Sequence, residues 1–270
     1  MIKNVLFNYH THTNYSDGKN TVRENVEKAL ELGFIQLGFS DHSVNSFYNE
    51  SDGMYDEYFK EVSEIREEYK DRIKIYIGLE QDIYSKEPDS RWEYIIGSTH
   101  YLKTDDKYLC VDSSAKITEE NVKKYFDGDY LKYAKEYYLQ ETKVAELPRV
   151  DIIGHFDLLT KFNEGYKQFD EDDKRYLNLA YECADVLLKK DVPFEINTGA
   201  IGRGYRTLPY PNEKILKYIH SKKGRIVITS DSHKIENLNC YFPQALELVK
   251  NCGFKSICRF DDGIWNECEI

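Results

Sequence analysis

Six of the seven histidines in this chain lie in short motifs that follow apolar, strand-like segments, and acidic residues accompany several of them. Imidazole and carboxylate groups are ligands that proteins use for zinc, manganese and iron. The motifs are His10-Thr11-His12 with Asp17, Asp41-His42, Gly78-Leu79-Glu80, Ser98-Thr99-His100, Gly154-His155 and Asp231-Ser232-His233. This set predicts a multinuclear metal site, which can generate hydroxide from water at neutral pH.

Most of these motifs, taken alone, also have a simpler explanation. His10 and His12 point to the same face of an extended segment, so they can bind one ion together or be ordinary packed residues. Asp17 precedes Gly18, a pair that also favours a plain turn. Glu80 ends an apolar strand, where a carboxylate is costly unless it is paired or bound to a metal. The recurrence of such groups at strand ends favours the metal site.

The elements that must position these side chains alternate along the chain, which predicts a parallel sheet covered by helices. Strands are expected at Val5–Tyr9, Ile35–Ser40, Ile73–Leu79, Tyr94–Gly97, Ile152–Gly154, Pro193–Ile196, Arg225–Thr229 and Ser256–Phe260. Helices are expected at Thr21–Leu32, Tyr55–Tyr69, Asp170–Lys190, Asn212–Lys222 and Pro243–Asn251. Because the carboxyl ends of so many strands converge on one mouth only in a closed barrel, we expect a single-domain α/β barrel over residues 1–270.

One connection, residues 101–150, is much longer than the others and is rich in tyrosine. Two helices are expected in it, at Glu119–Tyr125 and Leu131–Leu147. A long connection at the mouth of a barrel commonly serves as a lid or a substrate-binding cap. A helical insertion packed outside the site is an equally good interpretation, so both are kept.

The composition narrows the classes of function. The net charge of −11 argues against binding to nucleic acid or to an anionic membrane, because both need a basic surface. The six cysteines form no Cys-x-x-Cys pair, the N-terminus does not resemble a signal peptide, and no apolar run is long enough to span a membrane. We therefore expect a cytoplasmic protein that acts on a small molecule.

The ordered motifs resemble those of the PHP superfamily of polymerase and histidinol phosphatase domains. From Tyr9 to the C-terminus the chain is most similar to the stand-alone histidinol phosphatases, through the segment 151–157 (DIIGHFD), Glu195-Ile196-Asn197-Thr198 and Tyr210-Pro211. The resemblance implies a distorted (β/α)7 TIM-like barrel with the metal site at the C-terminal mouth of the strands and a peripheral or short eighth strand. It also implies hydrolysis of L-histidinol phosphate to L-histidinol and phosphate.

Position by position, the resemblance implies three divalent ions of zinc, manganese or iron. The first would take His10, His12, Glu80 and Asp231; the second would share Glu80 and add His100 and His155; the third would take Asp17, His42 and His233. Each of these positions holds a competent ligand, which argues against a non-catalytic relic of the fold. Three dications carry about six positive charges, enough to hold a phosphate dianion against the negative charge of the whole protein.

Our hypothesis for the reaction is attack on phosphorus by a hydroxide that bridges the first two ions, since metal binding lowers the pKa of water from about 15.7 toward about 7. The leaving alkoxide needs a proton, for which Asp231, Asp157 and a metal-bound water are the candidates. Arg203 resembles the family's phosphate-contacting arginine, although a solvated loop charge would fit the same residue. Lys161 lies where the family often has a second basic residue, so it either replaces that contact or the contact is absent.

Two alternative functions are kept. One is a PHP-type phosphatase for phosphotyrosine proteins or other small phosphomonoesters. The other is a nucleic-acid phosphoesterase, against which the negative net charge argues. Histidinol phosphate would need a pocket for an imidazole and an ammonium group, and the acidic, tyrosine-rich insertion is the candidate for it.

Overall fold

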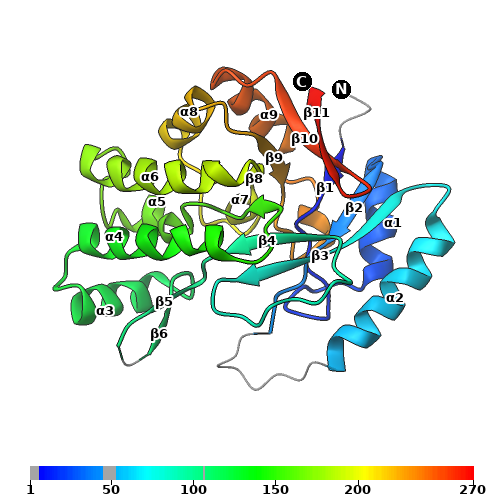
Figure 1. Cartoon of the computed structure of the whole chain (residues 1–270), viewed down its shortest axis with the longest axis horizontal. Helices are drawn as coiled ribbons and strands as arrows, with labels where there is room; N and C mark the ends of the chain where they lie inside the picture. The colour runs from blue at the N-terminus through cyan, green and yellow to red at the C-terminus, as the bar shows by residue number, and fades with distance from the viewer. Residues whose placement is uncertain (1–5, 45–52, 106) are drawn as a thin grey trace.

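The computed structural model of the chain describes residues 6–44, 53–105 and 107–270. Its main sheet has seven strands in the order β1-β2-β3-β4-β7-β8-β9, and all neighbouring pairs are parallel (Figure 1). They are β1 (Phe7–Asn8), β2 (Gln36–Phe39), β3 (Lys74–Asp82), β4 (Tyr94–Ser98), β7 (Ile152–Ile153), β8 (Phe194–Asn197) and β9 (Ile226–Thr229). Thr11 and Ser232, just beyond β1 and β9, form a parallel bridge that nearly closes the sheet. The predicted seven-stranded barrel is confirmed; Val5, the expected start of the first strand, lies outside the described residues.

Helices surround this barrel on its outside, and local sequence signals set their ends. The longer ones are α1 (Val22–Leu32), α2 (Gly53–Tyr69), α6 (Lys174–Leu187), α8 (Glu213–Ser221) and α9 (Phe242–Asn251); α5 (Asn163–Tyr166) and α7 (Gly199–Gly202) are short. Thr21 and Glu24 form a reciprocal capping box at the start of α1, and Gly33 ends the helix with a φ of 83°. Among the helices of the described residues, none has the length and apolar composition to cross a membrane.

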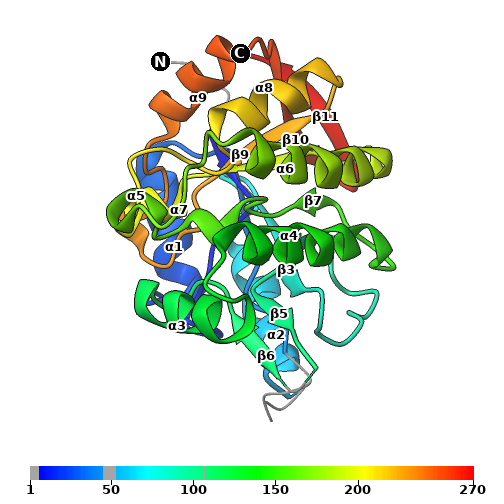
Figure 2. The ribbon, with the colours of Figure 1, turned by 90° about the vertical axis from the view of Figure 1, so that its left-hand side faces the viewer.

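Residues 101–150 form a hairpin and two helices beside the barrel. The hairpin joins β5 (Tyr101–Lys103) to β6 (Tyr108–Cys110), and the helices are α3 (Ala115–Tyr125) and α4 (Tyr130–Glu141). The helix expected to continue to Leu147 changes at Thr142 into a 3-10 turn, η1 (Thr142–Glu146). Helix α4 packs on α6 (Figure 2), where the hydroxyls of Tyr138 and Tyr176 lie 2.8 Å apart. Most tyrosines of α4 therefore belong to the core.

The centre of the barrel is filled by Tyr94, the first residue of β4. Its hydroxyl donates to the backbone carbonyls of Tyr9 and Phe39, at 2.6 and 3.0 Å. Gly38 and Gly78 leave room for the ring, since a side chain at either position would overlap it. Tyr9 comes directly before His10, and Phe39 comes two residues before Asp41, so this ring forms a floor below the motifs that follow β1 and β2.

The eighth expected strand does not join the barrel sheet. It is β10 (Ser256–Asp261), which pairs antiparallel with β11 (Ile264–Glu269). This hairpin packs against the barrel interior at the end opposite the mouth, where the rings of Phe260 and Trp265 contact Tyr9 with centroids 6.3 and 5.3 Å apart. The peripheral eighth strand that the family resemblance implied is therefore observed.

Candidate metal centre

The nine predicted ligands converge at the carboxyl ends of the strands, and Glu80 lies at their centre. Glu80 is in β3 and only 1% exposed. Its Oε1 atom lies 2.8 Å from His155 Nε2 and 3.2 Å from His100 Nε2. Its Oε2 atom lies 3.0 Å from His42 Nδ1 and 3.2 Å from His10 Nε2. His12 Nε2 lies 3.5 Å from the same Oε2 atom, so five histidines from four different connections face one carboxylate.

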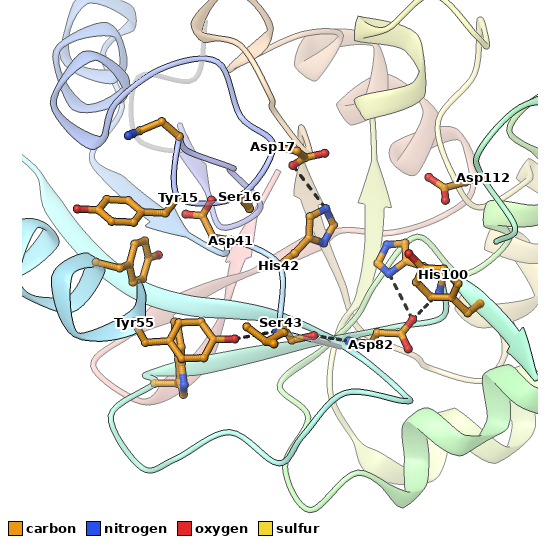
Figure 3. A pocket seen from close by; sticks show the side chains of 15 residues that line it. Tyr15, Ser16, Asp17, Asp41, His42, Ser43, Tyr55, Asp82, His100 and Asp112 are labelled. Atoms are coloured by element: carbon orange, nitrogen blue, oxygen red, sulfur yellow. Dashed lines mark hydrogen bonds and ion pairs between the residues drawn. The ribbon is translucent and has the colours of Figure 1, made fainter. Parts of the chain in front are cut away.

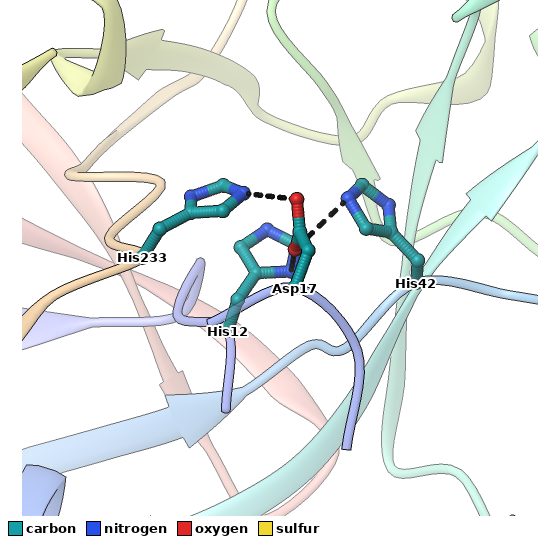
Figure 4. Close-up of side chains that lie close together, drawn as sticks. All are labelled: His12, Asp17, His42 and His233. Carbon is teal, nitrogen blue, oxygen red and sulfur yellow. Dashed lines mark ion pairs between the residues drawn. The ribbon is translucent and has the colours of Figure 1, made fainter. Parts of the chain in front are cut away.

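Asp17 forms the outer side of the cluster (Figure 4). One carboxylate oxygen lies 3.1 Å from His233 Nε2, and the other lies 3.6 Å from His42 Nε2 and 3.8 Å from His12 Nδ1. Asp17 is 58% exposed on its side chain, so this side of the cluster is open to solvent. A ligand in solution can approach from there.

Asp231, two residues after the end of β9, forms the inner side of the cluster. Its Oδ1 atom lies 3.3 Å from His12 Nε2 and 3.8 Å from His10 Nε2. Its backbone φ is 44°, a left-handed conformation that is uncommon for residues other than glycine and that occurs at functional sites.

The candidate ligands fall into three sets of side chains, and within each set the potential ligand atoms, one per residue, all lie within 4.8 Å of one another. Two ligands on opposite sides of one ion are about 4.6 Å apart, so the spacing in each set is within a few tenths of an ångström of the spacing in a metal site. The sets are His10, His12 and Asp231; His42, Glu80 and His100; and His12, Asp17, His42 and His233. They overlap the predicted division but differ in detail, since His12 and His42 each occur in two sets and His155 in none. The assignment of ligands to individual ions therefore stays a prediction.

Buried nitrogen atoms in the cluster support its fit to metal ions. The Nε2 atoms of His10 and His12 are buried and have no hydrogen-bond partner among the described residues. His10 Nδ1 lies 2.5 Å from Glu195 Oε1. Because a carboxylate only accepts, Nδ1 carries a proton, and Nε2, which faces Glu80 and Asp231, is the nitrogen at which a metal ion would replace a proton.

Glu195, in β8, is a functional residue to which sequence reasoning gave no role. It is fully buried and also accepts hydrogen bonds from Thr229 Oγ1 at 2.6 Å, the His155 amide at 2.7 Å and Asn197 Nδ2 at 2.9 Å. Carboxylates that orient metal-binding histidines in this way raise metal affinity. Glu195, like Glu80, is an acidic residue in an apolar strand, so the pattern that identified Glu80 could also have identified Glu195.

Asp82, the last residue of β3, supports His100 in a similar way. Its Oδ2 atom accepts from the His100 amide at 2.9 Å and lies 3.5 Å from the ring Nδ1. Its Oδ1 atom accepts from the Tyr84 amide at 2.8 Å. This carboxylate fixes the backbone and the ring of a candidate ligand.

The electrostatics of the cluster favour a bound cation. Burial lowers the pKa of His10, but Glu195, Glu80 and Asp231 outweigh it and raise that pKa well above its usual value. Burial and the neighbouring rings of His233 and His42 lower the pKa of His12 to about 3, which keeps it neutral and able to coordinate. Burial would raise the pKa of Glu80, yet the surrounding histidines hold it well below its usual value.

Arg203, the predicted phosphate contact, lies beside Asp231. Its Nη2 atom donates to Asp231 Oδ2 at 2.9 Å, and its Nη1 atom donates to the Asp231 carbonyl at 3.2 Å. Arg203 and Asp231 can lie this close together because residue 199 is a glycine. A β-carbon there would lie 2.8 Å from Asp231 and 3.0 Å from Arg203 Nη2. The guanidinium lines the cavity at the cluster.

The other two predicted residues differ in position. Lys161 lines the same cavity, but its Nζ atom is already paired with Asp112 Oδ2 at 2.8 Å. Asp157 does not line this cavity: it is fully buried, and its Oδ2 atom accepts from the Asn212 amide at 2.8 Å. Burial raises the pKa of Asp157 to about 7. Lys161 is therefore part of the cavity wall at the site, whereas Asp157 is buried outside that wall.

Two cavities meet at the cluster. The narrow cavity, of about 160 Å³, contains Arg203 and Lys161 together with candidate ligands. The larger cavity, of about 600 Å³, extends over the loops after β1, β2 and β4 (Figure 3). Its lining includes Tyr15, Tyr55, Tyr58, Trp92 and Tyr101 and the carboxylates Asp17, Asp41, Asp82 and Asp112. Together they offer space for a phosphate and for a larger organic group.

A parallel barrel with histidines and carboxylates at its mouth defines a class of metal-dependent hydrolases. Residues 8–199 match the PHP domain family, and the chain belongs to this family. Over 263 residues it is 24% identical to the histidinol-phosphatase of Bacillus subtilis, covering 88% of this chain and 97% of that protein.

Two solved structures share the fold. The histidinol phosphate phosphatase of Lactococcus lactis, crystallised with zinc, L-histidinol and phosphate, superposes with a TM-score of 0.74 at 22% identity and covers 96% of this chain and 98% of its own. The HisK protein of Listeria monocytogenes gives a TM-score of 0.76 at 21% identity, covering 88% of this chain and 99% of its own.

Proposed function

We propose that this protein is a divalent-metal-dependent phosphomonoesterase that hydrolyses L-histidinol phosphate to L-histidinol and phosphate. The observation that carries the proposal is the buried cluster around Glu80, in which nine side chains supply nitrogen and oxygen ligands next to the Arg203 guanidinium. The histidinol-phosphatase relative from Bacillus subtilis aligns over 88% of the chain, which supports the choice of substrate.

Bound divalent ions supply a nucleophile at neutral pH and neutralise the charge of the phosphate. The candidate ligands are His10, His12, Asp17, His42, Glu80, His100, His155, Asp231 and His233. Zinc, manganese and iron all suit these nitrogen and oxygen ligands, and three ions are proposed from the family resemblance.

The chain's own residues orient these groups. Glu195 holds the proton of His10 on Nδ1 and thereby directs Nε2 into the cluster. Arg203 offers N–H groups at the edge of the narrow cavity, where they can hold the oxygens of a phosphate. Its pairing with Asp231 fixes the plane of the guanidinium before substrate binds.

Proton delivery to the leaving alkoxide is best assigned to a water in the site. Burial would raise the pKa of Asp231, but Arg203 and His10 hold it well below its usual value, so this carboxyl stays ionised. Asp157 has a raised pKa, yet its carboxyl does not reach the narrow cavity. Of the candidates from the sequence, a solvent-derived donor therefore fits the geometry best.

The proposal is tested by phosphate release from L-histidinol phosphate, a phosphotyrosine peptide and an aryl phosphate, with the metal content of the protein measured in parallel. We expect kcat/KM to be clearly highest for L-histidinol phosphate. Glu80→Gln should lose both activity and bound metal while it keeps its fold, because it removes the central carboxylate. A higher kcat/KM for the peptide would refute the substrate and favour the phosphotyrosine alternative.

We also infer a cytoplasmic enzyme with a small-molecule substrate and without nucleic-acid or membrane partners. The net charge of −11 supports this inference. Binding of a single-stranded oligonucleotide at low salt, followed by fluorescence, tests it: tight binding would favour the nucleic-acid alternative.

A further inference from the structure

We propose that Asp112 is the specificity-determining carboxylate of this site, and that it selects phosphate esters whose alcohol carries an ammonium group close to the ester oxygen. The proposal rests on the proposed phosphatase function and names the part of the substrate that the larger cavity recognises. Asp112 follows β6 in the insertion and is not among the candidate metal ligands.

Asp112 lies where the two cavities meet. Four residues line both of them: Asp17, His42, His100 and Asp112. The first three are candidate metal ligands, so Asp112 is the one shared residue that is left to contact the organic part of a substrate. An ester with its phosphate in the narrow cavity and its alcohol in the larger cavity must therefore pass this carboxylate.

The charges of the two cavities differ in a way that orients such an ester. The narrow cavity contains Arg203 and Lys161, which favour the phosphate. In the larger cavity the described lining has four aspartates and no lysine or arginine (Figure 3). A positively charged group is therefore favoured there, and an anionic group is disfavoured.

Asp112 differs from the other three aspartates of that lining. Asp17 is a candidate metal ligand, Asp41 accepts three hydrogen bonds from Thr13 and Ser16, and Asp82 is committed to the amides of His100 and Tyr84. Asp112 Oδ2 accepts from Lys161, whereas among the described residues its Oδ1 atom has only the Cys110 thiol, a weak donor, at 3.4 Å. One oxygen is thus able to accept a further strong hydrogen bond.

The pair with Lys161 positions this carboxylate. Lys161 Nζ also donates to the Asp112 carbonyl at 3.1 Å, so two contacts to one residue fix its orientation. The Asp112 side chain is 26% exposed, so the pair lies at the cavity wall and not in bulk solvent. Burial would raise the pKa of Asp112, but the ion pair with Lys161, at 2.8 Å, holds that pKa well below its usual value, so the carboxylate is anionic.

The aromatic walls of the larger cavity complement this charge. Tyr55 and Trp92 form an edge-to-face pair with ring centroids 5.1 Å apart, and Tyr58 lies 5.8 Å from the Trp92 ring. Flat rings and π-faces of this kind bind a protonated or neutral imidazole. The larger cavity therefore offers both a carboxylate for an ammonium group and aromatic rings for an imidazole.

The test compares 2-aminoethyl phosphate with ethyl phosphate, which differ by one ammonium group. We expect Asp112→Asn to lower the ratio of kcat/KM for the amino ester to that for the neutral ester by about 10- to 100-fold, the range for a lost charged hydrogen bond. Asp127→Asn is the matched control, because Asp127 is an exposed aspartate of the same insertion that pairs with Lys132. It should leave the ratio unchanged. An unchanged ratio in Asp112→Asn would overturn the proposal.

A second measurement needs no variant. L-histidinol should inhibit wild-type hydrolysis of an aryl phosphate at least tenfold more strongly than its analogue without the amino group, since only the former has an ammonium for Asp112. Equal inhibition would overturn the proposal even if Asp112→Asn fails to fold. If L-histidinol phosphate is not the best substrate but the Asp112→Asn ratio still falls, the proposed substrate is wrong and the role of Asp112 stands.

Discussion

Replacing Glu195 by glutamine changes one atom and one charge in a fully buried group. Glu195 Oε1 accepts from His10 Nδ1 and Thr229 Oγ1, and Oε2 accepts from the His155 amide and Asn197 Nδ2. A glutamine has one oxygen and one NH₂ group, so in either orientation its NH₂ faces two donors. The substitution therefore leaves two hydrogen bonds unmade, and it loosens either the His10 ring or the backbone at His155, according to the orientation of the amide.

The size of the effect follows from this geometry. Loss of an outer carboxylate that orients a metal-binding histidine lowers metal affinity by about 10- to 100-fold, which corresponds to about 1.4–2.7 kcal/mol. Two unsatisfied buried donors cost about 1–3 kcal/mol each in folding stability. We expect a folded protein with weaker metal binding and a lower Tm, and partial recovery of activity at high metal concentration.

The assay is a competition titration with a metal chelator, read as retained metal and as kcat/KM. Glu141→Gln is the matched control, because Glu141 is also a buried glutamate but lies on α4 and is not a candidate ligand. Metal affinity of Glu195→Gln within about threefold of wild type would refute the role assigned to Glu195, as would an equal loss in Glu141→Gln.

Three further predictions follow from other parts of the structure. Arg203→Met should lower kcat/KM by about 10²- to 10³-fold by removing a charged phosphate contact; Arg225→Met, at the opposite end of the barrel, is the control, and equal losses in the two variants would contradict the assignment. Burial raises the pKa of Glu141 well above its usual value, so the folded state keeps a proton that the unfolded state releases, and stability falls as pH rises above the ordinary carboxyl range. Glu141→Gln should flatten the fall in the free energy of unfolding between pH 5 and 8 by up to about 1.4 kcal/mol per pH unit, and parallel curves of this free energy against pH for the variant and the wild type would contradict this. Removing metal with a chelator should abolish phosphate release and lower Tm without unfolding the protein, and added zinc or manganese should restore both; activity that survives complete removal would exclude a metal-dependent reaction.

The barrel could be predicted because its signals are local. Short apolar strands that each end in a polar motif predict a parallel barrel with a functional mouth, and Glu80 was recognisable because it follows the apolar run of its strand, which the structure extends to Asp82. The C-terminal end of α4 was harder to predict, since the 3-10 turn that follows packs its Val144 side chain against Gly97 of β4, a contact between distant parts of the sequence.

The sequence could not predict which ring nitrogen or carboxylate oxygen faces which neighbour, because this depends on side-chain positions to within about one ångström. His12 has one ring nitrogen directed at Asp17 and the other at Asp231, so its place among the ions depends on side-chain orientation. The pairing of Lys161 with Asp112 joins residues 49 positions apart and follows from the fold of the insertion. The tyrosines of α4 were counted toward a substrate pocket, yet most of them pack in the core.

The position of the Tyr94 ring has a consequence for the order in which the protein folds and binds metal. Because its hydroxyl joins the carbonyls of Tyr9 and Phe39, the strands below the ligands are held together by protein atoms alone. Small domains that lack such a core fold only when they capture their metal. Here the candidate ligands lie on a barrel whose core is complete without metal, so the chain can fold before it binds metal. The folded, metal-free protein can then bind its ions later. The ion it acquires would then depend on which metals the cell supplies after synthesis.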